Sequence, residues 1–179
     1  MNFKKLEITG FKSFSEKTIF LIENGLTGIV GPNGCGKSNI VESLRWCMGE
    51  NSAKSMRGSG MEDVIFSGTS NKPSKNISEV TLLLDNENND GPTQYKDFDE
   101  ISIRRKIEKE KGSKYYINDK EVRARDVQTF FADLSTGAHS PSLISQGRIG
   151  QLVTAKPIER KSILEEAAGI SGIHARRQE

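Results

Sequence analysis

The stretch Gly31-Pro32-Asn33-Gly34-Cys35-Gly36-Lys37-Ser38 decides the expected fold, because it matches the phosphate-binding pattern G-x-x-x-x-G-K-[ST]. The apolar residues 26–30 precede it and predict a short buried strand. After it, Ile40, Val41, Leu44 and Cys47 recur at helical spacing. The sequence therefore predicts a phosphate loop between a strand and the N-terminus of a helix.

Each residue type in this loop has a chemical reason. Gly31, Gly34 and Gly36 allow positive φ angles and a close approach of the backbone, so that successive N–H groups can surround an anion. The first turn of the helix adds unpaired N–H groups and the positive end of its dipole. Lys37 would reach the β and γ phosphates, and the Ser38 hydroxyl would bind Mg2+. The expected ligand is a nucleoside triphosphate, and an accidental glycine-rich turn is the alternative.

The composition is that of an ordinary folded domain. With 179 residues, 34% of them hydrophobic, the chain can bury one core and carry an appendage. No apolar stretch is long enough for a membrane span and no signal peptide is visible, so we expect a cytoplasmic protein. Cys35 and Cys47 give no disulfide framework, which fits a reducing compartment. We interpret Cys35 as a small loop residue, with redox sensing as the alternative.

The charge is nearly balanced, since the sequence has 26 Lys and Arg residues and 24 Asp and Glu residues, which gives a net charge of +2. Such a balance does not identify a nucleic-acid binder. Basic clusters lie at residues 104–106, at Arg123 and Arg125, and at residues 176–177. We interpret each cluster as solvated surface, and contact with DNA would require a local patch.

The remaining pattern predicts antiparallel strands around the phosphate loop. Alternating or β-branched runs predict strands at residues 3–8, 18–22, 79–85, 101–107, 115–117 and 121–123, with a further short strand at 142–145. Helical spacing predicts helices at residues 40–48 and 127–134, the second with Asp126 as its N-cap. Lys156 and Pro157 are expected to open a last helix. Residues 49–61 are expected to form a long surface loop.

Six sequence blocks in a fixed order link the chain to a known family. They are residues 10–14, 31–39, 55–58 with 61–63, 116–118, 145–148 and 165–169. With these blocks the chain resembles the N-terminal half of the ABC-type ATPase head of SMC (structural maintenance of chromosomes) proteins, those of bacteria in particular. The resemblance implies an α/β fold: a P-loop head lobe with a central strand, loop and helix, an antiparallel β subsheet, and the start of a coiled-coil helix. It implies that residues 1–154 form the N-terminal lobe of the head and residues 155–179 the neck helix.

The resemblance also implies roles for single residues. Around ATP it places Lys12, Ser13, Pro32, Asn33, Gly34, Cys35, Gly36, Lys37, Ser38 and Asn39, with the first two near the adenine or ribose. Lys37, Gln146 and Arg57 would be catalytic, Arg57 by reaching the nucleotide or a partner head. Ser38 and Gln146 would bind Mg2+, because a glutamine amide oxygen can ligate the metal and orient water without adding charge.

The family's catalytic head needs two further parts that this sequence lacks, an apolar strand ending in Asp-Glu and a Ser-Gly-Gly signature. The family carries both in a C-terminal half beyond the coiled coil, so we expect the chain alone to bind ATP weakly and to hydrolyse almost none. The implied partners are this C-terminal half, a second SMC head in a homodimer, a kleisin-type subunit at the neck, and double-stranded DNA, with no membrane. The implied role is ATP-driven chromosome condensation and segregation at the nucleoid.

Three other functions stay open at this point. Residues 82–85 look like an apolar strand that ends in an acid, so the chain could be a self-contained P-loop NTPase or kinase that uses Asp85 or Asp63 with Mg2+. The alternating polarity of this strand and the turn chemistry after Asp85 argue against that function. The other two are a non-catalytic module whose nucleotide controls assembly, and the head of a coiled-coil DNA-repair ATPase.

Overall fold

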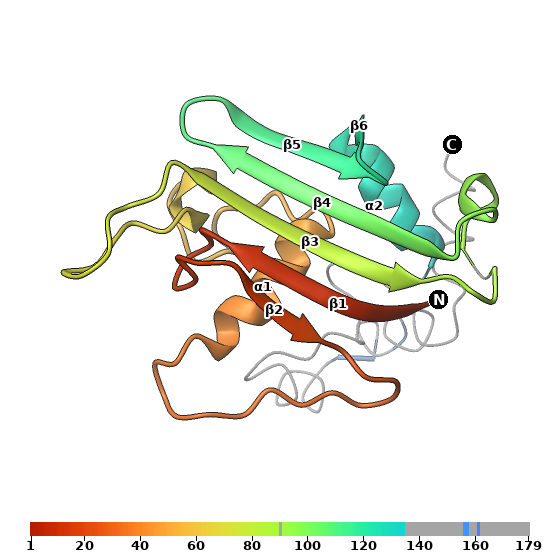
Figure 1. The fold of residues 1–179 in the computed structure, drawn as a ribbon, viewed down its shortest axis with the longest axis horizontal. Helices are drawn as coiled ribbons and strands as arrows, with labels where there is room; N and C mark the ends of the chain where they lie inside the picture. The colour runs from red at the N-terminus through yellow and green to blue at the C-terminus, as the bar shows by residue number, and fades with distance from the viewer. Residues whose placement is uncertain (90, 135–155, 158–160, 162–179) are drawn as a thin grey trace.

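Six antiparallel strands form one sheet in the computed structural model, which describes residues 1–89, 91–134, 156–157 and 161 (Figure 1). Across the described sheet the strands follow the order β2-β1-β3-β4-β5-β6. Their bounds are β1 (Asn2–Thr9), β2 (Thr18–Leu21), β3 (Ile77–Asp85), β4 (Glu100–Glu108), β5 (Gly112–Ile117) and β6 (Lys120–Val122). Six of the seven strands predicted within residues 3–123 are thereby confirmed, with small shifts at their ends.

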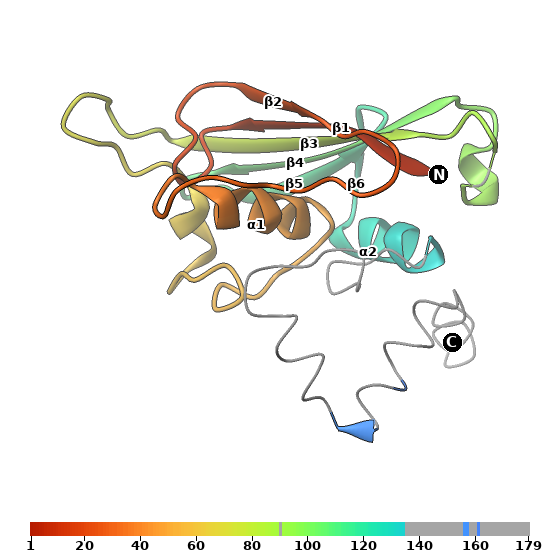
Figure 2. The same cartoon turned by 90° about the horizontal axis from the view of Figure 1, so that it is seen from below.

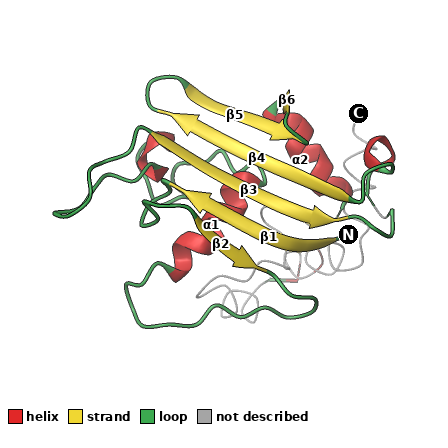
Figure 3. Ribbon diagram, viewed as in Figure 1, coloured by secondary structure: helices red, strands yellow, loops and turns green. Residues whose placement is uncertain are grey.

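The helices α1 (Lys37–Cys47) and α2 (Ala124–Asp133) lie on the same face of the sheet, as the edge-on view of Figure 2 shows. Strand alternation selects this face, because every second side chain of β3, from Ser78 to Leu84, is buried. Figure 3 shows the loops around these elements, which contain two short 3-10 helices, η1 (Met61–Val64) and η2 (Thr93–Tyr95). The helix predicted at residues 40–48 is confirmed as α1.

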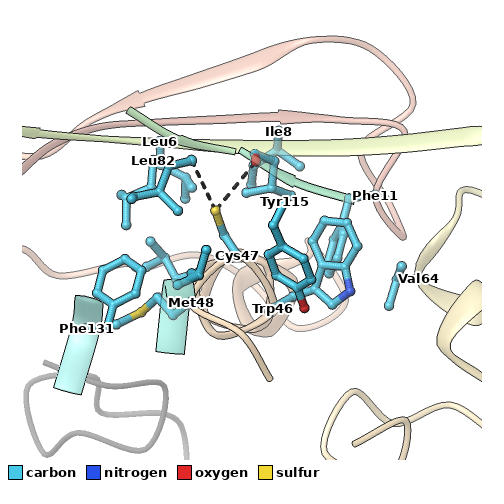
Figure 4. Close-up of a cluster of buried hydrophobic side chains, with 14 of the residues drawn as sticks. Leu6, Ile8, Phe11, Trp46, Cys47, Met48, Val64, Leu82, Tyr115 and Phe131 are labelled. Carbon is cyan, nitrogen blue, oxygen red and sulfur yellow. Dashed lines mark hydrogen bonds between the residues drawn. The ribbon is translucent and has the colours of Figure 1, made fainter. Parts of the chain in front are cut away.

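Trp46 and Cys47 fix α1 against the sheet (Figure 4). The buried ring of Trp46 lies 5.5 Å from the ring of Phe11, which belongs to the connection after β1. The Cys47 thiol lies 3.5 Å from the carbonyl oxygen of Val80 and 3.4 Å from that of Ile103. Burial raises the pKa of this thiol to about 12. The helix that follows the phosphate loop is therefore held directly against β3 and β4.

Arg105 is buried in the core, so placing it on solvated surface with its basic neighbours was wrong. It lies on the inner face of β4, and its guanidinium carbon is 4.4 Å from the ring centre of Trp46 and 4.6 Å from that of Tyr115. It donates hydrogen bonds to the carbonyl oxygens of Trp46 at 2.8 Å and Glu50 at 2.7 Å. Burial lowers its pKa. Arg105 therefore closes the C-terminal end of α1, where helix carbonyls need donors.

The second helix begins earlier than predicted, and Asp126 is not its N-cap. Helix α2 starts at Ala124 with the extended residue Arg123 as its N-cap. Asp126 stands at the third helical position, and its carboxylate accepts a hydrogen bond of 2.9 Å from the Arg123 N–H. Its acidic side chain still stabilises the helix start, but from inside the first turn.

The strand predicted at residues 26–30 does not form, and that prediction was wrong. Within the described residues this segment pairs with no strand, because the sheet ends at β2. Leu26 is 99% exposed and Val30 is 92% exposed. An apolar run becomes a buried strand only where a neighbouring strand and a covering layer are present. The strand element of the predicted central unit is thus missing, while its loop and helix are present.

Some predictions fall outside the described residues. These are the short strand at 142–145, Gln146, and nearly all of the neck helix at 155–179, so the domain boundary at residue 154 remains a prediction. Among the helices of the described part, none combines the length and apolar character needed to cross a membrane.

Candidate nucleotide-binding site

The phosphate loop lies at the N-terminus of α1, as the sequence predicts. Gly36 is the N-cap residue with a φ of 90°, and Gly34 has a φ of 81°. A Cβ atom on Gly36 would lie 2.8 Å from the Ser13 hydroxyl oxygen, so this position accepts only glycine. No side chain caps the helix, and its first turn contains no acidic residue. The first turn therefore presents backbone N–H groups and the positive end of the helix dipole to the loop.

Lys37 folds its side chain back into the loop. Its ammonium nitrogen donates to the carbonyl oxygens of Gly31 and Pro32, each at 2.6 Å, and lies 3.9 Å from the Cys35 sulfur. An ammonium is a mobile point charge with three donors, and phosphate oxygens are acceptors of the same kind as these carbonyls. The hydroxyl-bearing Ser38 is the next residue of α1. This donor set, with an uncapped helix start, fits a polyphosphate with Mg2+.

A short hydrogen-bond chain joins the loop to two distant segments. The Asn39 amide nitrogen donates to the Ser13 hydroxyl oxygen at 2.8 Å. The Asn39 amide oxygen accepts a hydrogen bond of 2.8 Å from the guanidinium of Arg57. The structure therefore brings together Ser13, Gly36, Asn39 and Arg57, which the sequence placed around one nucleotide.

Glu42 is a site residue that the sequence analysis missed. Its carboxylate is only 9% exposed, and each oxygen binds a different cation. The Lys12 ammonium lies 2.5 Å from one oxygen, and the Nε atom of Arg57 lies 2.5 Å from the other. Lys12 also donates to the Met56 carbonyl oxygen. The signal was present in the helix, since Glu42 follows Ser38 by four residues and so lies on the same face of α1.

Comparisons with known proteins agree with this geometry. A family model described as the RecF/RecN/SMC N terminal domain matches residues 2–147. The chain belongs to the SMC family. The resemblance identified from the six sequence blocks is confirmed.

Two curated relatives align with the whole of this SMC chain. Over 179 residues it is 56% identical to the chromosome partition protein Smc of Cereibacter sphaeroides and 55% identical to that of Rhodopseudomonas palustris. All of the chain is covered, but only 16% of each relative. The chain thus spans about one sixth of the length of these proteins.

Solved SMC heads have the same fold. A structure described as the Smc head bound to the C-winged helix domain of ScpA superposes with a TM-score of 0.85 at 32% identity, covering 96% of this chain and 52% of that one. A Pyrococcus furiosus Smc head with an extended coiled coil, bound to the C-terminal domain of ScpA, gives a TM-score of 0.83 at 31% identity. It covers 98% of this chain and 44% of that one. The α/β SMC head lobe is therefore confirmed as the fold class.

The two acidic residues considered for a self-contained NTPase have other partners in this SMC lobe. The Asp85 carboxylate accepts a hydrogen bond of 3.0 Å from the Glu87 N–H, which closes the turn after β3. Glu79, at the other end of β3, pairs with the end of β1 that leads toward Ser13. Asp85 is six residues farther along, about 20 Å of strand. This separation gives no support to a metal or base role for Asp85 at the phosphate loop.

Asp63 likewise closes a turn. Its carboxylate accepts hydrogen bonds from the N–H groups of Gly60 at 2.9 Å and Ser59 at 2.7 Å, and from the Ser59 hydroxyl at 2.9 Å. The Gly60 and Ser59 donors hold the pKa of this carboxyl below its usual value. Asp63 therefore shapes the end of the loop that carries Arg57.

The predicted nucleotide, Mg2+ and catalytic roles of the site residues all stay predictions. Gln146 lies outside the described residues, so its Mg2+ role rests on the resemblance. Lys12 is in place beside the loop, but its ammonium is engaged by Glu42 and Met56, and its contact with adenine or ribose is untested. Cys35 is exposed in the loop, whereas Cys47 is buried.

Proposed function

We propose that this SMC chain binds ATP with Mg2+ and forms the N-terminal half of an ATPase head. With a C-terminal half and a second head it would hydrolyse ATP and drive chromosome condensation and segregation on DNA. The observation that carries the proposal is the uncapped start of α1, where Gly34 and Gly36 have positive φ angles and the Lys37 ammonium lies within the loop. Family membership supports the same function.

Each part of the site has a task in this proposal. The backbone N–H groups of residues 34–38 and the Lys37 ammonium would hold the β and γ phosphates. The Ser38 hydroxyl and the Gln146 amide oxygen would hold Mg2+. When bound there, Mg2+ would supply positive charge that offsets the negative charge developing on the phosphate during transfer. Arg57 and Asn39 stand beside the loop, where a guanidinium can stabilise phosphate charge from this head or from a facing one.

The isolated chain is proposed to be almost inactive in hydrolysis. Phosphoryl transfer depends on positioning and charge stabilisation, so a site that lacks its base and its covering element turns over slowly. Within the described residues no cluster of three His, Cys, Asp or Glu side chains can hold a metal. The acid beside the loop, Glu42, is neutralised by two cations. The missing acids would come from the C-terminal half.

The exposed segment before the loop supports a covering partner. Leu26, Ile29 and Val30 present apolar side chains to solvent in the connection that follows β2, which is the edge of the described sheet. Burying such residues is favourable by about 1.5–3 kcal/mol each. We propose that the C-terminal half of the head covers these exposed side chains.

The wider assembly is proposed from the relatives. Structures of Smc heads bound to ScpA domains support a kleisin-type subunit at the neck, and the Smc relatives support a homodimer of heads. Double-stranded DNA as the substrate and a cytoplasmic, nucleoid-associated location complete the proposal. Relatives named chromosome partition protein at 55–56% identity favour this function over DNA repair.

A turnover assay with separated halves tests the proposal. This chain, the C-terminal head half of the Cereibacter sphaeroides relative, and a mixture of the two are each incubated with Mg-ATP. The mixture is expected to release phosphate at least about tenfold faster than either half, because only the mixture contains a whole catalytic site. The mixture made with Lys37→Ala is the control and stays at background. Turnover by the chain alone at the rate of the mixture contradicts the proposal.

A further inference from the structure

Glu42 is the meeting point of two segments that flank the phosphate loop. Lys12 comes from the connection after β1, and Arg57 comes from the loop between α1 and η1. Both cations reach the same nearly buried carboxylate, one at each oxygen. We propose that Glu42 is a positioning residue, which sets the place of the Arg57 guanidinium beside the phosphate loop and thereby the rate of ATP turnover. The proposal rests on the ATPase function proposed above.

The backbone gives independent support. Lys12 has a φ of 46° and Arg57 a φ of 55°, both in the left-handed region that non-glycine residues seldom adopt. Each is held there by a backbone hydrogen bond, from the Lys12 N–H to the Val64 oxygen at 2.7 Å and from the Arg57 N–H to the Lys54 oxygen at 3.0 Å. Such conformations cost about 1–3 kcal/mol and cluster at functional sites. Both of these residues form an ion pair with Glu42.

Contacts run without a break from Glu42 to the phosphate loop. Glu42 binds Nε of Arg57, and a terminal nitrogen of the same guanidinium donates to Asn39. Asn39 donates to Ser13, whose hydroxyl oxygen lies against Gly36. A displacement of Arg57 would therefore reach the loop through two side chains.

Arg57 is held at one end and exposed at the other. Its side chain is 57% exposed, although Nε and one terminal nitrogen are engaged. A guanidinium has five N–H donors in a fixed fork, so anchoring one edge fixes the direction of the other. Glu42 thus aims the solvent-facing edge of Arg57, which suits contact with a phosphate whose charge rises during transfer.

The charge balance explains why the carboxylate is needed. Without the negative charge of Glu42, Lys12 and Arg57 would repel each other across a nearly buried site. Lys12 is 13% exposed and has the Met56 carbonyl oxygen as a second acceptor, so the exposed Arg57 would be the residue that leaves. The phosphate loop itself keeps Lys37 and its glycines. Loss of Glu42 should therefore lower turnover more than ATP affinity.

The test is a double-mutant cycle in the complete head, made of this chain and the C-terminal half. Glu42→Gln is expected to lower kcat about tenfold and to change the Kd for Mg-ATP less than about threefold. Glu42→Asp keeps the charge but is too short to reach both cations, so kcat should fall about threefold. The Arg57→Ala head is itself expected to turn over ATP slowly. In that head, either Glu42 substitution should lower kcat by less than about a further twofold.

The matched control is Glu7→Gln on the opposite face of the sheet. Glu7 also binds two cations, Lys5 at 2.9 Å and Lys17 at 2.8 Å, but it lies away from the loop. Its substitution should leave kcat within about twofold of wild type. Melting temperatures of all variants separate loss of positioning from loss of the fold.

Three results would overturn the positioning role. The first is unchanged kcat in both Glu42 variants. The second is a loss of kcat from the Glu42 substitutions that is as large in the Arg57→Ala head as in wild type, since independent effects are additive in free energy. The third needs no activity: phenylglyoxal should modify Arg57 at least about threefold faster in Glu42→Gln than in wild type, and equal rates contradict the proposal. A wild-type head that binds no Mg-ATP defeats the proposed function instead, and the phenylglyoxal rates still decide the role of Glu42.

Discussion

The sheet and the segment before the phosphate loop use the same residue types but lie in opposite environments. Leu82 and Val80 of β3 are 0% exposed, whereas Leu26 and Val30 are 99% and 92% exposed. Strand β3 is paired with β1 and β4 and contacts α1. Residues 26–30 pair with no strand of the described part. The difference therefore lies in the partners available and not in the hydrophobic pattern.

The buried sheet is packed within this chain alone, whereas the exposed segment at residues 26–30 is the one that we propose a partner covers. The core under the sheet has all its layers, from β1 to β5 and the two helices. The loop that would hold phosphate is attached to that core through α1 and through the hydrogen bond between Asn39 and Ser13. A stable lobe can thus carry the part of an ATPase site that we propose for this chain.

The largest expected difference between the exposed loop and the buried core is in the reactivity of the two cysteines. Cys35 lies exposed in the loop and Cys47 lies in the core, where burial raises its pKa to about 12. At pH 8 the reactive thiolate of Cys47 is then a fraction of about 10⁻⁴. Iodoacetamide is expected to label Cys35 at least about a thousandfold faster, as measured by peptide mass spectrometry. Equal labelling in folded protein would mean that α1 does not pack as described.

Arg105→Ala should destabilise the buried core under the sheet. The substitution removes two hydrogen bonds to helix carbonyls and empties the space between Trp46 and Tyr115. We expect a loss of about 3 kcal/mol in the free energy of unfolding, measured by urea denaturation. Arg104→Ala, at the half-buried neighbouring position on β4, should cost less than about 1 kcal/mol. Equal losses for both variants would argue against a buried Arg105.

Leu26→Asp should act only on the region that needs a partner. The isolated chain should keep its melting temperature, because Leu26 contributes nothing to its core. Binding of the C-terminal half should weaken by about tenfold or more, since a buried leucine is worth about 1.5–3 kcal/mol. Phe98→Asp, at another exposed apolar residue, is the control in the same calorimetric titration. An unchanged Kd for Leu26→Asp would remove this segment from the proposed interface.

Most of the fold could be predicted from the sequence, because most strands find their partners nearby in the chain. The register of β3 with β4, from Ile77 with Glu108 to Asp85 with Glu100, follows from two alternating runs joined by a turn-rich connection. The strand prediction for residues 26–30 failed because the described sheet offers this segment no strand to pair with. The prediction for Arg105 was wrong for another reason. Its position in the alternating run indicated the buried face of the strand, but its charge favoured a place on the solvated surface.

The parts of the site that consist of consecutive residues could be predicted from the sequence. The contacts between segments that are distant in the sequence could not. The phosphate loop and the first turn of α1 depend on consecutive residues, so the motif fixed them. Glu42 was overlooked because the helix was interpreted through its apolar residues alone. Its meeting with Lys12 and Arg57 depends on how two separate connections pack against α1, which no local spacing reveals.

The most direct test of the account is isothermal titration of the chain with Mg-ATP. The account predicts saturable, magnesium-dependent heat below about 1 mM ligand, and a Kd at least about tenfold higher for Lys37→Ala. Lys17→Ala, whose lysine binds Glu7 away from the loop, should bind as wild type does. No heat with well-folded chain at millimolar Mg-ATP, or equal affinity for Lys37→Ala and wild type, would contradict the claim that residues 31–38 hold a polyphosphate.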